Sequence, residues 1–239
     1  MEIVVRAAAE HEVQAAATVL AEAFAEDPVL AEIRPARVGE DRVAVLGRLF
    51  AALIRAVPSQ GRAVDVAVAG DRVVGAGFWQ VPLPHRGGVR AFVRQVPELV
   101  RVLGIAGGLR ALAHLRRMER ARPDAPHWYL AEIGVSGSAR GQGVGGRLLE
   151  HALDRVDRGR QGSYLESSTP HNRRLYRRHG FAEGAPLTGF ASAAPVSMWR
   201  PAADDGVGGP GGGNRAAATP VSASSPRTTC VDQENPPRG

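Results

Sequence analysis

The stretch from Arg140 to Gly146 has the residue types of an anion-binding turn. It reads Arg-Gly-Gln-Gly-Val-Gly-Gly and stands directly before a segment with helical periodicity. Glycine costs a helix about 1 kcal/mol relative to alanine, so four glycines here require another reason. Without β-carbons, the free N–H groups of the first helical turn stay open to a negative group, which the helix dipole also favours. With Arg140 as a mobile positive charge beside them, the pattern predicts phosphate or diphosphate binding.

The elements around this turn alternate between strands and helices. A strand from His127 to Val135 leads into the turn, and apolar positions of period 3.6 predict a helix from Val144 to Arg158. Further along we expect a strand Ser163 to Ser167, a short helix Asn172 to His179, and strands near Phe181 to Phe190 and Ala194 to Arg200. A strand, helix and strand in succession imply a parallel pair at the centre of the sheet.

The first half of the chain predicts antiparallel pairing. A strand Ile3 to Arg6 is followed by amphipathic helices from Val13 to Phe24, which Asp27-Pro28 ends, and from Val43 to Val57, which Pro58 ends. Two strand-like runs, 63–69 and 72–81, are joined by Gly70-Asp71 as a β-hairpin. The fold class is therefore mixed α/β, with a mostly antiparallel sheet.

An arginine-rich segment lies between the hairpin and the strand that begins at His127. Nine arginines fall between Arg86 and Arg122, and the apolar spacing predicts two helices separated by Gly107-Gly108. As a nucleic-acid surface the segment lacks interleaved aromatic residues and any recognised motif. We expect its helices to line or cover a substrate pocket, and we expect neither nucleic acid nor a membrane as a partner.

Composition indicates one domain, residues 1–200, followed by a Gly/Pro/Ser-rich tail, residues 201–239, that we expect to be disordered. The net charge is +6, and all 30 basic residues are arginine. The only cysteine, Cys230, lies in the tail, which excludes a disulfide or a core thiol nucleophile, and the seven histidines show no metal-ligand spacing. Without a signal sequence or an apolar run of membrane-spanning length, we expect a cytoplasmic protein, monomeric or homodimeric, without a metal.

Two known phosphate-binding patterns compete for the turn. Gly141-x-Gly143-x-x-Gly146, with Glu166 twenty residues further on, formally matches the dinucleotide fingerprint. The motif comes late in the chain and follows a hairpin, so a doubly wound parallel sheet cannot be built around it. A P-loop is excluded because Gly-Lys-Ser/Thr is absent.

A second template covers more of the chain. Arg140-x-x-Gly143-x-Gly145 resembles the Arg/Gln-x-x-Gly-x-Gly/Ala motif of the GNAT acyltransferase superfamily, and the block from Asn172 to Phe181 resembles its Asn-x-x-x-x-Tyr-x-x-x-Gly-Phe pattern. The stretch from Tyr164 to Asn172 further resembles antibiotic-modifying members of the puromycin N-acetyltransferase kind. The resemblance implies a six- to seven-stranded sheet with helices on both faces and a central parallel pair splayed at a cofactor cleft.

The resemblance also implies acetyl-CoA as cosubstrate and a set of residues that hold it. Backbone groups on the strand before the turn would bind the pantetheine arm, the turn would hold the pyrophosphate, and Asn172 would touch the cofactor from the next helix. The predicted cofactor-binding residues are Ile133, Gly134, Val135, Arg140, Gly141, Gln142, Gly143, Gly145, Gly146 and Asn172. A second interpretation makes Asn172 only the cap of its helix.

An amine must lose its proton before it attacks a thioester, and the departing thiolate benefits from an acid. The family pattern puts Tyr176 in the place of the acid, although its ring could equally be a core residue. Glu132, on the opposite strand face from Ile133, is the candidate base or else an ion-pair partner of an arginine, and Glu166 is a weaker candidate. His127 could also be a base, against the simpler interpretation as a surface histidine.

The sequence thus predicts transfer of an acetyl group from acetyl-CoA to an amine of a small molecule, by direct attack in a ternary complex. A protein or peptide N-acetyltransferase, a non-catalytic dinucleotide-binding module and a nucleic-acid-binding protein are the alternatives. The acceptor itself stays open among primary-amine antibiotics, polyamines, amino acids and protein N-termini.

Overall fold

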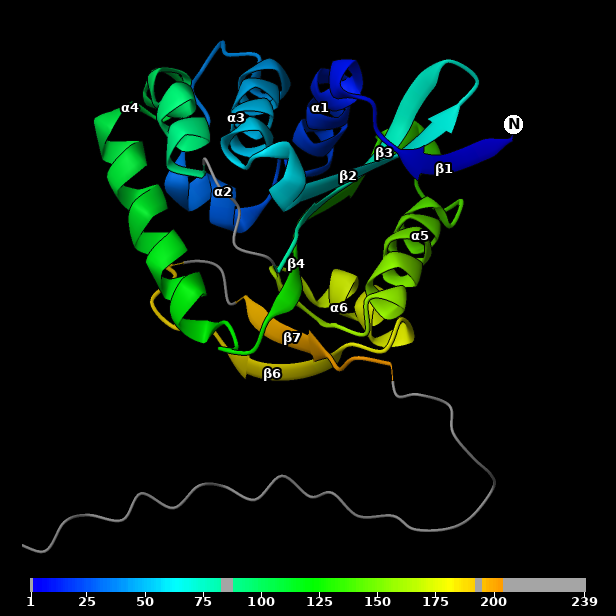
Figure 1. The fold of residues 1–239 in the computed structure, drawn as a ribbon. Helices are drawn as coiled ribbons and strands as arrows, with labels where there is room; N and C mark the ends of the chain where they lie inside the picture. Colours follow the sequence, from blue (N-terminus) through cyan, green and yellow to red (C-terminus); the bar gives the residue numbers. More distant parts are fainter. Residues whose placement is uncertain (1, 83–87, 192–194, 204–239) are drawn as a thin grey trace, which may run out of the picture. The chain divides into compact units, whose positions relative to one another are not determined.

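A computed structural model describes residues 2–82, 88–191 and 195–203. Within these ranges, seven strands form one sheet in the order β1-β2-β3-β4-β5-β7-β6 (Figure 1). The strands are β1 (Ile3–Ala7), β2 (Arg62–Ala69), β3 (Arg72–Gln80), β4 (His127–Val135), β5 (Gly162–Ser167), β6 (Ala182–Pro186) and β7 (Val196–Arg200). Every neighbouring pair is antiparallel except β4 and β5, which confirms the predicted mixed sheet. The predicted tail lies outside the described residues from 204 onward.

Helices cover both faces of the sheet, as predicted. They are α1 (Val13–Ala23), α2 (Pro28–Ile33), α3 (Arg42–Ala56), α4 (Gly88–Ala121), α5 (Val144–Arg158) and α6 (Pro170–Arg178). Leu20 of α1 and Phe50 of α3 share a buried cluster with Phe78 of β3. Val144 and Leu148 of α5 pack on Ala67 of β2 from the other side of the sheet. Figure 1 shows α1 and α3 on one side of the strands and α5 on the other.

The chain between α1 and α3 contains a helix that the sequence interpretation left out. α1 ends at Ala23, before Asp27-Pro28. This dipeptide begins α2, because the Asp27 carboxylate accepts from the Leu30 N–H at 3.0 Å and Pro28 fills the first helical position. Only one carboxylate oxygen of Asp27 caps the helix, and the other accepts from Ser168 just after β5.

The arginine-rich segment forms two helical parts, but their boundary differs from the prediction. Gly104, with φ of 66° and ψ of 176°, interrupts α4, whereas Gly107 and Gly108 lie inside the second part. A β-carbon on Gly107 would stand 3.3 Å from the carbonyl oxygen of Ile33. This glycine therefore permits close packing of α4 on the end of α2 instead of breaking the helix.

The parallel pairing at the centre of the sheet is short. β4 and β5 pair only through His127 with Gly162, Trp128 with Ser163, and Tyr129 with Tyr164. Just beyond, the pairing of β4 with β3 steps from Leu130 to Glu132 while β3 advances by one residue, so Ala131 is the extra residue of a β-bulge. A bulge bends its strand and increases the local twist, and β4 and β5 do not pair beyond it.

Helix α5 ties the two parts of the sheet together across this gap. Arg155 forms a two-pronged ion pair with Asp65 of β2, at 2.8 and 3.2 Å, and Asp65 is fully buried. Two residues further along, Asp157 accepts from Arg200 of β7 at 2.6 and 2.8 Å. Paired, two-pronged arginine contacts of this kind fix orientation as well as distance.

The contact between β4 and α1 gives a stability prediction. A β-carbon on Gly134 would lie 2.6 Å from Cβ of Ala23, so Gly134→Ala should destabilise the protein by about 1–3 kcal/mol through overpacking. Gly137→Ala is the matched control, because a β-carbon there meets nothing within 4 Å and should change stability by less than about 0.5 kcal/mol. Urea unfolding measures both, and equal stability of the two variants would contradict the packing.

Candidate active site in the gap between β4 and β5

The glycine-rich turn between β4 and α5 is held by its own hydrogen bonds. The Ser136 N–H donates to the carbonyl of Val74 at 2.9 Å, and the Gln142 side chain donates to the carbonyl of Ser138 at 3.1 Å. Gly141 and Gly143 have φ of 76° and 73°, in the left-handed region that favours glycine. A β-carbon on either would meet nothing within 4 Å, so both glycines border open space.

The first turn of α5 has no side-chain cap. Gly143 occupies the capping position and offers no side-chain oxygen, so the N–H groups at the start of α5 stay available for an anion. The exposed Arg140 stands beside them. Gly145 and Gly146 face α6 instead, where β-carbons would lie 3.5 Å from Leu175 and 3.6 Å from His179. The structure thus gives the four glycines two roles, access and helix packing.

The strand that leads into the turn has one edge without a strand partner. Ile133, Gly134 and Val135 pair with β3, and among the described residues they pair with no strand on the β5 side. Their outward backbone N–H and C=O groups therefore face the gap, where an extended ligand with amide groups can bond to them. Gly134 itself is packed against α1, so its contribution is restricted to backbone atoms.

Helix α6 carries the two predicted residues on the other wall of the gap. Thr169 caps this helix by accepting from the Asn172 N–H at 3.3 Å, so the interpretation of Asn172 as the cap is wrong. The half-buried side chain of Asn172 is therefore available for another partner. Tyr176 is buried, with its ring edge-on to Phe181. Burial and the nearby charge of Glu132 raise the pKa of the Tyr176 hydroxyl above its ordinary value, so it stays protonated.

Three acids converge on the face of the sheet that carries α1. Glu132 lies opposite Phe78, which belongs to the α1 cluster, whereas Ile133 packs on the α5 side, as the strand alternation predicted. Burial raises the pKa of Glu132 well above its usual range, and the charges of Asp27 and Glu166 raise it further. Asp27 is held toward this site by Ser168, whose hydroxyl donates to it at 2.7 Å.

Glu166 and two tyrosines continue this acidic face toward the end of α4. The Glu166 side chain is 4% exposed, and burial raises its pKa although the nearby Arg122 opposes the shift. Tyr129 and Tyr164 stack with ring centroids 6.2 Å apart, and the Arg122 guanidinium lies 3.6 Å from the Tyr129 ring centroid. Burial and the charge of Glu166 raise the pKa of the Tyr164 hydroxyl, which stays protonated. Glu166, Tyr164, Tyr129 and Arg122 thus form one buried polar cluster.

The sequence interpretation missed four of these groups, namely Asp27, Arg122, Tyr129 and Ser168. Alternation along β4 gave a usable signal for Tyr129, which pairs with Tyr164 at the last of the three parallel positions between β4 and β5. No local pattern brings Asp27 to Ser168, because 141 residues separate them. His127, considered as a base, bonds through Nδ1 to the carbonyl of Ala125 at 2.7 Å and packs edge-on to Trp199 at the closed end of the gap.

Comparisons with known proteins agree with this geometry. A family model described as an acetyltransferase (GNAT) domain matches residues 99–183, which include β4, the turn, α5, β5 and α6. A crystal structure from Corynebacterium glutamicum, described as histone acetyltransferase HPA2 and related acetyltransferase, is 30% identical, with 87% of this chain and 100% of that chain covered and a TM-score of 0.66. A putative GNAT-family acetyltransferase from Desulfovibrio desulfuricans, 15% identical over 84% of this chain and 100% of its own, has a TM-score of 0.50.

The chain belongs to the GNAT superfamily of acetyltransferases. The alternative of a doubly wound dinucleotide-binding fold is wrong, because all but one of the strand pairs are antiparallel. Within the described ranges no helix is long and apolar enough to cross a membrane. The same residues contain no group of three or more histidine, cysteine, aspartate or glutamate side chains placed to hold a metal ion.

The raised pKa of Glu132 predicts how stability depends on pH. Below the unfolded-state pKa of about 4.3, Glu132 is protonated in both states, whereas at higher pH the folded state resists its ionisation. The wild type should therefore lose stability relative to Glu132→Gln as the pH rises toward the folded-state pKa. Thermal unfolding of both proteins between about pH 4.5 and about pH 8 measures this difference. A difference that stays constant over this range would contradict the shift.

Proposed function

We propose that this protein transfers the acetyl group of acetyl-CoA to a primary amine of a small molecule, by direct attack in a ternary complex. The observation that carries the proposal is that two regions of opposite electrostatic character lie at the same gap. An uncapped helix start with open glycines lies at the end of β4, and three acids lie on the β4 face toward α1. The first suits a diphosphate and the second a cationic amine.

The residues present fit acetyl-CoA, which would supply the activated thioester. The α5 N–H groups, with Arg140 beside them, would hold its pyrophosphate. Open space at Gly141 and Gly143 admits a phosphate that a side chain would block. The free edge at Ile133 and Val135 would bond to the amide groups of the pantetheine arm, and Asn172 would contact it from α6.

Glu132 is the proposed base. Its carboxylate carries a raised pKa, because burial and the charges of Asp27 and Glu166 oppose ionisation, and a base works best with a pKa near the working pH. The same three acids favour an incoming ammonium group. Glu132 then takes the proton that the amine must lose before it attacks.

Tyr176 is the proposed acid. Its hydroxyl stays protonated because burial and the charge of Glu132 raise its pKa, so a proton is available for the departing sulfur at neutral pH. The contribution of the Glu132 charge to this pKa supports the assignment of both groups, one proton acceptor and one proton donor, to the same gap.

A protein or peptide amine is the second candidate acceptor. The description of the Corynebacterium glutamicum structure as a histone acetyltransferase and related acetyltransferase favours it, since that chain is 30% identical. The buried position of Glu166 and Tyr164 favours a small ligand that enters the gap.

We further propose that the reaction takes place in the cytoplasm.

A thiol-release assay across an amine panel tests the function. Full-length protein, acetyl-CoA and polyamines, aminoglycosides, amino acids or peptide N-termini should give CoA release with at least one small-molecule amine. With that amine, kcat/KM should rise with pH along an acid limb that Glu132→Gln abolishes. Release only with peptides would move the acceptor to the second candidate, and release with no amine would reject the proposal.

The glycine turn gives a prediction on cofactor affinity. Gly143→Glu puts a carboxylate beside the free N–H groups of α5 and should abolish acetyl-CoA binding measured by calorimetry. Because any side chain at a positive φ is strained, Gly70→Glu is the matched control: Gly70 has φ of 63° and open space around it, in the β2–β3 hairpin. Loss of binding in both variants, or in neither, would place the pyrophosphate elsewhere.

The acid gives a prediction on turnover. Tyr176→Phe keeps the ring that packs on Phe181 and removes only the hydroxyl, so acetyl-CoA affinity should hold. The kcat value should fall by about 10²-fold, as expected when a general acid is removed. Steady-state kinetics with the best amine of the panel measures it. An unchanged kcat would reject the role as acid and leave Tyr176 with a packing role only.

A further inference from the structure

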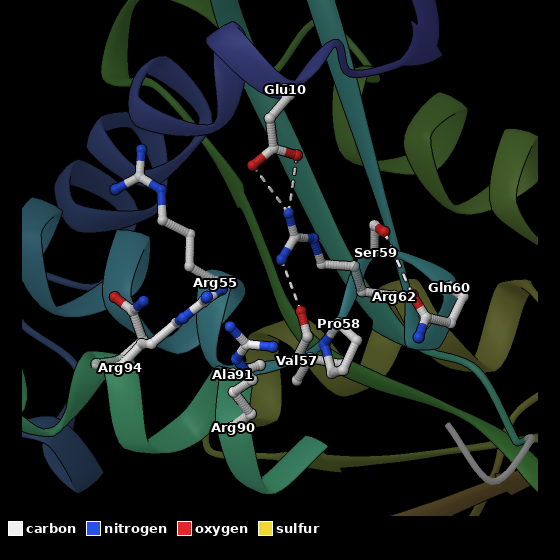
Figure 2. A pocket seen from close by; sticks show the side chains of 11 residues that line it. Glu10, Arg55, Val57, Pro58, Ser59, Gln60, Arg62, Arg90, Ala91 and Arg94 are labelled. Carbon is white, nitrogen blue, oxygen red and sulfur yellow. Dashed lines mark hydrogen bonds and ion pairs between the residues drawn. The ribbon is translucent and has the colours of Figure 1, made fainter. Parts of the chain in front are cut away.

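A cavity lined by arginines lies away from the glycine turn and shares no residue with the gap. It has a volume of about 540 Å³ and is formed by the end of α3, the start of β2 and the first turns of α4 (Figure 2). Four arginines line it, namely Arg55, Arg62, Arg90 and Arg94, and Glu10 is the only acid among its eleven lining residues. Sites for small molecules commonly have volumes of about 300–1,000 Å³, so this one exceeds the size of a single phosphate.

The register of the sheet separates this cavity from the acetyl-CoA turn. Arg62 at the start of β2 pairs with Gln80, which pairs with Tyr129 near the start of β4, whereas the turn follows Val135 at the other end of β4. The six residue steps from Tyr129 to Val135 span about 20 Å along β4, which separates the cavity from the turn. None of the lining residues belongs to the turn or to the acidic face around Glu132.

Arg62 neutralises the groups in the cavity that would repel an anion. Its guanidinium donates to the Ile54 and Val57 carbonyls at the end of α3, at 2.9 and 2.6 Å, and to both carboxylate oxygens of Glu10, at 3.0 and 2.8 Å. Figure 2 shows these contacts to Glu10 and Val57 as dashed lines. The negative helix end and the only acid are therefore both paired, which leaves the remaining arginines in excess.

Among the described residues, the three other arginines have no partner. Across residues 2–82, 88–191 and 195–203, no hydrogen bond or ion pair involves the side chains of Arg55, Arg90 or Arg94. Figure 2 shows Arg90 and Arg94 extending from α4 toward the end of α3. Both also lie in the first turns of a long helix, where the dipole is positive. Like charges around one cavity repel each other until an anion joins them.

We propose that this cavity is a second anion-binding site, which takes a small molecule with two or more phosphate or carboxylate groups. Guanidinium groups bind such groups through paired N–H donors, and three unpartnered arginines offer more donors than one phosphate uses. The site binds independently of acetyl transfer, because it shares no residue with the gap.

Calorimetry on the full chain tests the site, with pyrophosphate and citrate as probes and CoA at saturation to block the glycine turn. At least one probe should bind with one-to-one stoichiometry, and the better probe identifies phosphate or carboxylate as the preferred group. The double variant Arg90→Ala/Arg94→Ala should weaken that binding by at least about tenfold, and Arg55→Ala, on a different helix, should weaken it too.

Arg116→Ala/Arg120→Ala is the matched control, since it removes the same charge from exposed positions of the same helix. It should retain affinity within about twofold, because distant exposed charges are screened. Equal loss in both double variants would show diffuse surface attraction and overturn the site. Absence of probe binding to the wild type, or binding unaffected by all three variants, would overturn it as well. Circular dichroism verifies the fold of each variant.

Discussion

The pairing between β4 and β5 stops after Tyr129 and Tyr164, and the site depends on that stop. If the two strands stayed paired to their ends, the backbone of Ile133 and Val135 would bond to β5 and the gap would be filled. The bulge at Ala131 bends β4 at the point where the pairing ends. The cost of an interrupted sheet is offset by α5, whose Arg155–Asp65 and Asp157–Arg200 pairs connect β2 and β7 across the interruption.

The distribution of charge reconciles a strongly basic chain with the cationic substrate that we propose. Its net charge of +6 acts at long range, where salt screens it, but Asp27, Glu132 and Glu166 act at contact distance in a partly buried site. Burial raises the pKa of Glu132, and the charges of Asp27 and Glu166 raise it further. Under the proposed function, the field of these acids would attract the ammonium form of the amine and would also make Glu132 a better proton acceptor.

Periodicity in the sequence was sufficient for the sheet, the main helices and the turn, because each depends on local patterns. The helix from Val144 and the central parallel pair are examples. The break in α4 was misplaced, since a glycine can serve packing or a change of direction and only its neighbours decide which. Of the proposed site, the family pattern supplied Tyr176 and strand alternation supplied Glu132, but Asp27 and Arg122 come from distant segments that only the tertiary fold brings near β4. Contacts between such segments leave no spacing to detect.

The free edge of β4 has a consequence for solubility. A strand edge at the margin of a sheet can recruit a strand from another molecule, and proteins protect such edges with charge, bulges or covering elements. Here the unpaired edge lies in the interior of the sheet, next to a bulge and closed at one end by the contact of Tyr129 with Tyr164. The bulge and the closed end leave few backbone groups to which a second polypeptide strand could pair. The same few groups are enough for the amide groups of the ligand that we propose, so this architecture would serve ligand binding while it protects the edge against strand addition.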